Sequence, residues 1–186
     1  QIVRQFYESG NADSKYLVNV FDINLNDRNI LSHIKQIKPS LEAAISHDVA
    51  EEGKSVAESI DAENEQERST YAQDTAKLLL MSSLSEATHG LMGLNDSEIL
   101  GYLCEPNVEL NYYKKALEEI KTQSWYLKMD NRGRLYFQNT KNMIAEMNTL
   151  VESYSNENAR KELKKFLEEN FKPNIKNCYE QLYVLP

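Results

Sequence analysis

The segment 125–139, WYLKMDNRGRLYFQN, constrains the fold most, because it reads as a β-hairpin in a chain that otherwise shows helical periods. Apolar and polar residues alternate on both sides of a tight polar turn from Asp130 to Gly133, and Gly133 can adopt a positive φ. An isolated two-stranded hairpin is only marginally stable in water, so its apolar face should pack against neighbouring helices. That face consists of Trp125, Leu127, Leu135 and Phe137.

Three helical stretches precede this hairpin. In the first, Thr70 and Gln73 have the spacing of a capping box, and in the second Asn95 is the expected N-cap with Glu98 three residues later. The third, over 107–124, is amphipathic. Three short helices followed by a two-stranded hairpin is the order of a winged helix, in which the hairpin is the wing. The apolar stripe of the third helix contains Leu110, Tyr113, Leu117 and Ile120.

The N-terminal part also shows helical periods. We expect short helices near 2–6 and 16–20, and a longer one that Asp27 caps and Pro39 stops. The acidic stretch 51–68 has few large apolar residues and is typical of a solvated helix or a connection. Between them, a helix from Ser40 should present one apolar stripe, made of Leu41, Ala44, Ile45 and Val49.

The whole pattern predicts a mainly α fold with a small β component: a helical bundle with a winged-helix unit and flanking C-terminal helices. We predict a helical lid-like region at 1–68, the winged-helix unit at 69–139, and helices leading toward a further domain at 140–186. A break at Ser155 should divide the last region, whose helices should pack back onto the first part. The apolar positions expected to face inward are Met143, Met147, Leu150, Val151, Tyr154, Leu163, Phe166 and Leu167.

Composition limits the function more than the fold. The formal net charge of −8 over 186 residues repels phosphate backbones, so any binding of nucleic acid requires a local basic patch. No signal peptide or run of eighteen apolar residues is visible, and Cys104 and Cys178 do not form a CxxC pair. We therefore expect a cytoplasmic protein without membrane contact. The first residue is not Met and the last segment reads as an unpartnered strand, so we expect a fragment of a larger protein.

The third helix and the wing carry the candidate DNA-binding residues. Glu118, Glu119 and Asp130 lie among these cations, and a face of mixed charge is more often a solvated helix surface. The pattern therefore favours contacts with other protein domains over contacts with DNA. The candidates are Asn111, Lys114, Lys115, Lys121, Lys128, Arg132 and Arg134.

No motif predicts catalysis or a bound cofactor. The tripeptide Gly53-Lys54-Ser55 resembles the end of a P-loop, but Asp48 stands at the position of the first glycine, where an anion would oppose phosphate. His33, His47 and His89 are scattered without carboxylates or cysteines at ligand spacing. We predict no cofactor, metal or enzymatic activity for this chain.

The order of these segments resembles the region after the ATPase core in DUF499-type, AAA-like ATP-binding proteins, which include PglY-like ATPases associated with phage defence. The resemblance covers about residues 20–155, and its most telling piece is LEEIKTQSWYLKMDNRGRLYFQNTKNM. It implies a parent ATPase that binds ATP and Mg²⁺ and acts with methyltransferases and nucleases against foreign DNA. Because no nucleotide site is visible, this part would couple the core to neighbouring domains, partner proteins or DNA. A DNA-binding regulator and a plain protein-interaction domain remain as alternatives.

Overall fold

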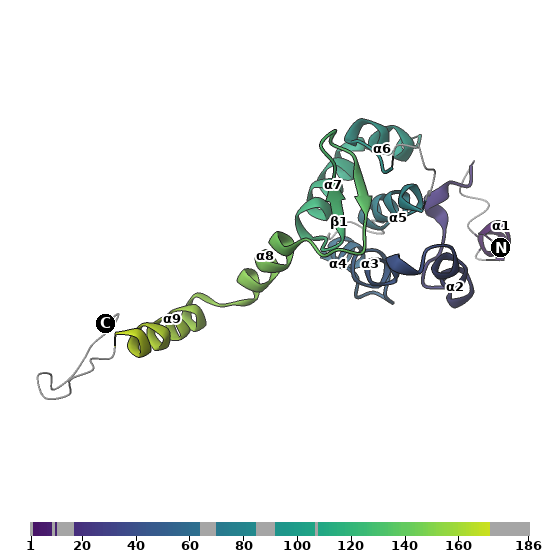
Figure 1. The fold of residues 1–186 in the computed structure, drawn as a ribbon. Coiled ribbons are helices and arrows are strands. Elements are labelled where there is room, and N and C mark those ends of the chain that lie inside the picture. The colour runs from purple at the N-terminus through teal and green to yellow at the C-terminus, as the bar shows by residue number, and fades with distance from the viewer. Residues whose placement is uncertain are drawn as a thin grey trace, which may run out of the picture. The chain divides into compact units, whose positions relative to one another are not determined.

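The computed structural model describes residues 2–8, 10, 17–63, 70–84, 92–106 and 108–171 (Figure 1). The chain divides into two compact units, Gln1–Glu146 and Met147–Pro186. The first is mainly helical, with a two-stranded antiparallel hairpin packed against helices, as the sequence predicts. None of the helices in the described ranges combines the length and apolarity needed to cross a bilayer.

The N-terminal part of the first unit consists of short helices. Asp27 caps α2, because its carboxylate accepts hydrogen bonds from the backbone N–H groups of Asn29 (2.8 Å) and Ile30 (3.2 Å). The helix predicted near 16–20 is wrong over 17–19, which are irregular, and residue 16 lies outside the described residues. The elements are α1 Ile2–Glu8, η2 Val20–Asp22, α2 Arg28–Ile37, η3 Pro39–Leu41, α3 Glu42–Ala44, η4 Ile45–Val49 and α4 Val56–Glu63.

The second part of this unit has the predicted order of three helices and a hairpin. Three members of the predicted α7 stripe, Tyr113, Leu117 and Ile120, are buried, and the fourth, Leu110, is half-buried. Gly133 has a φ of 75° in the turn. In the hairpin, Leu127 pairs with Phe137 and Met129 with Leu135. The elements are α5 Tyr71–Ser83, α6 Asp96–Leu103, α7 Leu110–Gln123, β1 Leu127–Met129 and β2 Leu135–Phe137.

The hairpin packs on α5 through β2. The backbone N–H of Phe137 donates to the Ser83 hydroxyl at 2.8 Å, and Leu94 forms a β-bridge with Leu135. Three members of the predicted apolar face are buried, whereas Trp125 is half-buried and stacks on His47 of η4. The indole therefore contacts the N-terminal part of the chain and not only the three helices that precede it.

The acidic segment 51–68 contains a helix, which is one of the two predicted forms, but over its described residues this helix is not solvated. Its helix α4 belongs to the core, with Ala57 and Ile60 buried. Two of its carboxylates, Glu58 and Asp61, are also buried because each accepts several hydrogen bonds. One apolar core runs from Phe21 to Phe137, so the predicted regions 1–68 and 69–139 share it; residues 64–69, where we placed their boundary, lie outside the described residues.

Helices α8 Met143–Ser153 and α9 Asn156–Asn170 confirm the predicted break, and Ser155 caps α9. Seven of the eight apolar positions that we predicted to face inward are exposed, and the eighth, Leu167, is half-buried. How the two units sit relative to each other is not determined, so packing of these helices onto the first unit stays a prediction. The exposed residues are Met143, Met147, Leu150, Val151, Tyr154, Leu163 and Phe166.

Candidate nucleic-acid interface

The exposed side of α7 carries the first group of candidate residues. Asn111, Lys114 and Lys115 point to solvent because the opposite stripe is buried in the core. Lys115 lies 3.6 Å from Glu119 one turn later, which is a loose and exposed pair. No charged partner approaches Lys114 within the described residues. This part of the helix therefore offers two exposed cations, of which Lys115 stands beside a carboxylate.

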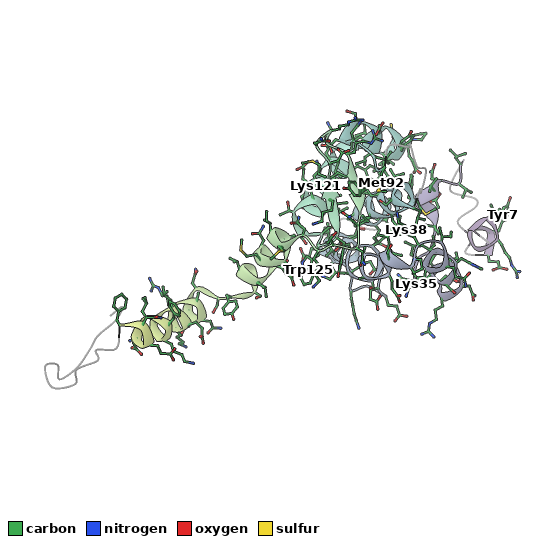
Figure 2. The ribbon with its side chains drawn as sticks, viewed as in Figure 1. Tyr7, Lys35, Lys38, Met92, Lys121 and Trp125 are labelled. Atoms are coloured by element: carbon green, nitrogen blue, oxygen red, sulfur yellow. The ribbon has the colours of Figure 1, made fainter. Side chains whose placement is uncertain are left out.

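Lys121, at the end of α7, is held by two carboxylates. Its ammonium lies 2.8 Å from Asp96 and 2.8 Å from Glu118 (labelled in Figure 2). Partial burial alone would lower the pKa of Lys121, but the hydrogen bonds from Asp96 and Glu118 outweigh it and raise that pKa. This cation therefore serves to join α6 to α7, and a phosphate would have to compete with both carboxylates.

Arg134 holds the hairpin to the loop before α6. Its guanidinium approaches Glu98 at 3.0 Å and donates to the carbonyl oxygens of Gly93 (2.6 Å) and Met92 (3.3 Å). Only 11% of the side chain is exposed. The backbone N–H of Asn95, followed by Arg134, lowers the pKa of Glu98, so this pair stays charged. Arg134 acts within the fold and presents little of its charge to a ligand.

The two remaining candidates lie in the hairpin. Lys128 donates to the carbonyl oxygen of Lys141 at 3.0 Å, whereas Arg132 is exposed in the turn and its side chain makes no hydrogen bond or ion pair among the described residues. The turn itself is fixed by Asp130, which accepts from the backbone N–H groups of Arg132 and Arg134, each at 2.8 Å. Four candidates thus keep an exposed side chain: Asn111, Lys114, Lys115 and Arg132.

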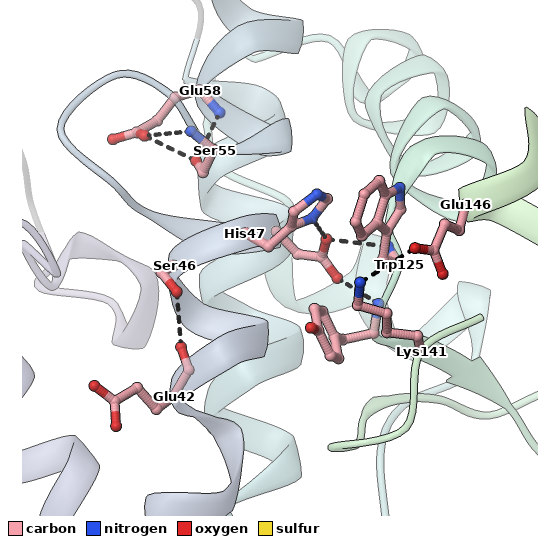
Figure 3. Close-up of polar contacts among 10 residues, drawn as sticks. Glu42, Ser46, His47, Ser55, Glu58, Trp125, Lys141 and Glu146 are labelled. Carbon is pink, nitrogen blue, oxygen red and sulfur yellow. Dashed lines mark hydrogen bonds and ion pairs between the residues drawn. The ribbon is translucent and has the colours of Figure 1, made fainter. Parts of the chain in front are cut away.

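A buried junction between η4 and the hairpin was not predicted. The carboxylate of Asp48 accepts hydrogen bonds from the backbone N–H groups of Trp125 (3.0 Å) and Tyr126 (2.7 Å), and it lies 2.6 Å from Nδ1 of His47 (Figure 3). Asp48 is 1% exposed. One signal was present, because Asp48 falls on the same helical stripe as Ala44 and Ile45 and must therefore face the core.

Further contacts of this junction surround the indole ring of Trp125. His47 stacks on Trp125 with the ring centroids 4.0 Å apart, and the Lys141 ammonium lies 4.5 Å from the indole centroid. Lys141 also pairs with Glu146 at 3.2 Å, and the backbone N–H of Asn142 donates to the Trp125 carbonyl. The base of the hairpin is therefore anchored to η4 and to the start of α8.

In the Gly53-Lys54-Ser55 loop, a carboxylate of the same chain, that of Glu58, takes the place that a phosphate would have in a P-loop. The Glu58 carboxylate accepts hydrogen bonds from the backbone N–H groups of Glu51 (2.9 Å) and Ser55 (3.1 Å) and from the Ser55 hydroxyl (2.8 Å; Figure 3). This is a capping box at the start of α4. Donors that a P-loop would turn toward phosphate are already satisfied by a carboxylate, which supports the rejection of a nucleotide site here.

The described residues hold no group of three or more His, Cys, Asp or Glu side chains that could bind a metal ion. His33 and His47 lie apart on α2 and η4, and His89 lies outside the described residues. No protein-family model, curated protein or solved structure matches this chain. The resemblance to DUF499-type ATPases therefore stays a prediction.

Proposed function

We propose that this chain is a non-catalytic, cytoplasmic coupling module of a larger AAA-like ATPase of the phage-defence type that it resembles. ATP and Mg²⁺ would bind the core of that parent protein, and the partners of this module would be other domains of the same polypeptide or proteins of the same defence system. The observation that carries the proposal is the Asp48 junction, which joins the lid-like helices to the wing.

A coupling module must move as one body, so that a displacement at one end reaches the other. The junction supports this behaviour because a buried carboxylate with two main-chain hydrogen bonds fixes direction as well as distance. The continuous core from Phe21 to Phe137 adds to the same rigidity. A shift of η4 should therefore carry the hairpin with it rather than be absorbed between them.

The cations of α7 and the wing favour protein contacts over DNA contacts, because several of them are already bound within the fold. Lys121 and Arg134 are held by carboxylates, and Lys128 is bound to a carbonyl oxygen. Over the whole chain 29 Asp and Glu outnumber 21 Lys and Arg, and the resulting net charge of −8 repels a phosphate backbone. The wing and α7 accordingly suit a protein surface of mixed charge.

The coupling is tested in the complete polypeptide by Asp48→Asn, which keeps the shape of the side chain but removes its charge. We expect basal ATP hydrolysis to persist, while the partner protein or DNA no longer changes the hydrolysis rate. Glu51→Gln, at an exposed position just after η4, is the matched control and should change neither rate. A variant at Asp48 that retains the full response to partners would refute the proposal.

DNA binding remains a second candidate, because Lys114, Lys115 and Arg132 are exposed. Fluorescence anisotropy with duplex DNA at two salt concentrations distinguishes DNA binding from coupling through protein contacts. If the module binds DNA, Lys114→Glu or Arg132→Glu should weaken binding and lower the salt slope by about one for each phosphate that the variant no longer neutralises. Lys161→Glu on α9 is the control. We expect no binding at low salt and no difference among the variants.

A further inference from the structure

The helical segment from Pro39 to Val49 changes its hydrogen-bond pattern along its length. It begins as a 3₁₀ turn, continues through α3 and ends in η4, which is a π-helical turn. In η4 the backbone N–H of Ala50 donates to the carbonyl oxygen of Ile45, five residues earlier, at 2.9 Å. Turns of this kind are rare and occur frequently at functional sites. This one contains Asp48, the residue on which the junction with the hairpin depends.

The sequence of the segment, by contrast, has the period of an α-helix. Its apolar residues have the spacing i, i+3, i+4, i+8, which places them on one side of an α-helix, and all of them are buried. They are Leu41, Ala44, Ile45 and Val49. The sequence is therefore compatible with an α turn, in which the N–H of Val49 rather than that of Ala50 would donate to Ile45.

Contacts from outside the segment hold the π turn. Asp48 accepts hydrogen bonds from the backbone N–H groups of Trp125 (3.0 Å) and Tyr126 (2.7 Å), and the ring of His47 stacks on Trp125 at 4.0 Å (Figure 3). In an α turn, Asp48 would be rotated about the helix axis relative to Ile45. Its carboxylate would then leave the position from which it reaches both donors. The π turn and the attachment of the hairpin therefore depend on each other.

The loop that follows η4 can accommodate a change of register. An α turn uses one residue fewer than a π turn, so the loop must take up the extra residue. Gly53, with a φ of 91°, has wide conformational freedom, and nothing lies within 4 Å of its Cβ position. Glu52 has a φ of 48° and is the one residue other than glycine with a positive φ among the described residues. Such a conformation is unfavourable for Glu, and its relaxation would favour the change.

We propose that η4 is a two-state element, in which the π turn holds the hairpin and an α turn releases it. The structure shows the attached state. The inference rests on the proposed function, because it adds the regulation of the coupling: the wing follows the lid-like helices only while the π turn is formed. A partner that binds one of the two states better would shift the equilibrium toward that state.

Hydrogen exchange of the full chain, followed by NMR, tests the proposal without any partner. A released state populated at about 0.1 to 10% would limit the protection of the Trp125 and Tyr126 amides to about 10- to 1,000-fold. The amides of Leu79 and Ile120, in α5 and α7, should exchange only through global unfolding. Their protection should be about 5,000-fold or more.

Deletion of Ser46 distinguishes a change of register from simple fraying of the hairpin. Ser46 is half-buried, and its hydroxyl donates to the carbonyl oxygen of Glu42 at 3.0 Å. Without Ser46, Ala50 follows Ile45 by four residues, so an α turn can form while both ends of the turn keep their positions. The turn then has one register, and the protection of the Trp125 and Tyr126 amides should rise about fivefold or more, to the level of the core. Ser46→Ala is the matched control, because it keeps the length of the turn, and it should exchange as the wild type does.

Three results would overturn the proposal. Wild-type protection of the Trp125 and Tyr126 amides equal to that of Leu79 and Ile120 would show a single state. Unchanged protection after deletion of Ser46 would show that the hairpin frays by itself. Loss of the core protection after that deletion would show that the flanking residues require the longer turn. A junction with one state still couples the lid-like helices to the wing, so these results are separate from the test of the proposed function by ATP hydrolysis.

Discussion

At the scale of residues, one carboxylate, that of Asp48, fixes the position of the hairpin. Asp48 satisfies two main-chain donors that the burial of Tyr126 would otherwise leave without water, and His47 lies against it at 2.6 Å. The hairpin has only three residues in each strand, and such a ribbon is weak by itself. Its position therefore depends on residues outside it.

Replacement of Asp48 by Ala should be costly, because it leaves the N–H groups of Trp125 and Tyr126 buried without an acceptor. We expect the free energy of unfolding to fall by about 2 to 4 kcal/mol, and by less for Asp48→Asn, which retains one acceptor oxygen. The free energy of unfolding of each variant is measured by urea unfolding, with the fluorescence of Trp125, the single tryptophan, as the signal. Glu51→Ala, at an exposed site, should change stability by less than about 0.5 kcal/mol. An equally small change for Asp48→Ala would contradict the role given to the junction.

Gly93 is a second residue on which the hairpin depends. Its φ is 74°, and a Cβ atom there would lie 2.2 Å from the carbonyl oxygen of Leu135. Gly93→Ala should therefore lower the free energy of unfolding by about 2 kcal/mol or more, through both strain and collision. Gly101→Ala in α6 is the matched control, because nothing lies within 4 Å of its Cβ position. Alanine inside a helix should raise stability there by up to about 1 kcal/mol. Equal effects at the two sites would refute this account.

At the scale of elements, the sequence predicts best where the signal is local. The Asp27 cap of α2, the capping box of Asn95 and Glu98, and the Gly133 turn all follow from residues within four positions of each other, and each is present. The capping box predicted at the start of α5 is wrong, because the residue that caps this helix is distant in the sequence. Thr70 makes no capping bond to the backbone, and its place is taken by a residue of the preceding helix, Asp61. No local pattern contains that contact.

The same limit applies to the candidate site. Spacing along α7 separates buried from exposed positions correctly, since a helix repeats every 3.6 residues. It cannot show that Lys121 meets Asp96 or that Arg134 meets Glu98, because those partners come from other elements. A list of cations read from a sequence therefore overstates the charge that the folded surface presents.

The cap of α5 should give the protein a dependence on pH. Asp61 accepts from the backbone N–H groups of Ala72 (2.9 Å) and Gln73 (3.0 Å), yet burial outweighs these bonds and raises the pKa of Asp61. The folded state then holds this proton more tightly than the unfolded state. The resulting stabilisation is complete below the ordinary pKa and is lost as the pH rises through the raised pKa.

Comparison with Asp61→Asn, which does not titrate, isolates this effect. The free energy of unfolding of the wild type minus that of the variant should fall between about pH 3 and about pH 7. Urea unfolding of both proteins at each pH measures it. A difference that grows with pH would show that the hydrogen bonds outweigh burial, and a constant difference would show that the two effects cancel; either result would contradict the prediction.

Glu58 provides a control of opposite sign. Burial alone would raise the pKa of Glu58, but the hydrogen bonds from Asn26, Glu51 and Ser55 together outweigh it and lower that pKa. The stabilisation is then present above the ordinary pKa and lost as the pH falls through the lowered pKa. The free energy difference between the wild type and Glu58→Gln should therefore increase with pH over the same range.

At the scale of the whole molecule, the shared core predicts how the first unit unfolds. Ile30 of α2 and Phe137 of β2 belong to one cluster of buried residues, although the composition of the chain changes sharply between them. If 1–68 and 69–139 were separate domains, damage in α2 would leave the hairpin unaffected. With one core, both parts should unfold together.

Ile30→Ala distinguishes the two cases, because Ile30 is 5% exposed and lies far in sequence from Trp125. We expect the free energy of unfolding to fall by about 2 to 4 kcal/mol. The urea midpoint read by Trp125 fluorescence should move together with the midpoint read by far-ultraviolet circular dichroism. Ile144→Ala, at an exposed position of α8, should move neither midpoint. A tryptophan signal that stays in place while the helical signal shifts would divide the unit near residue 69, and the wing would then lack the rigid connection that coupling requires.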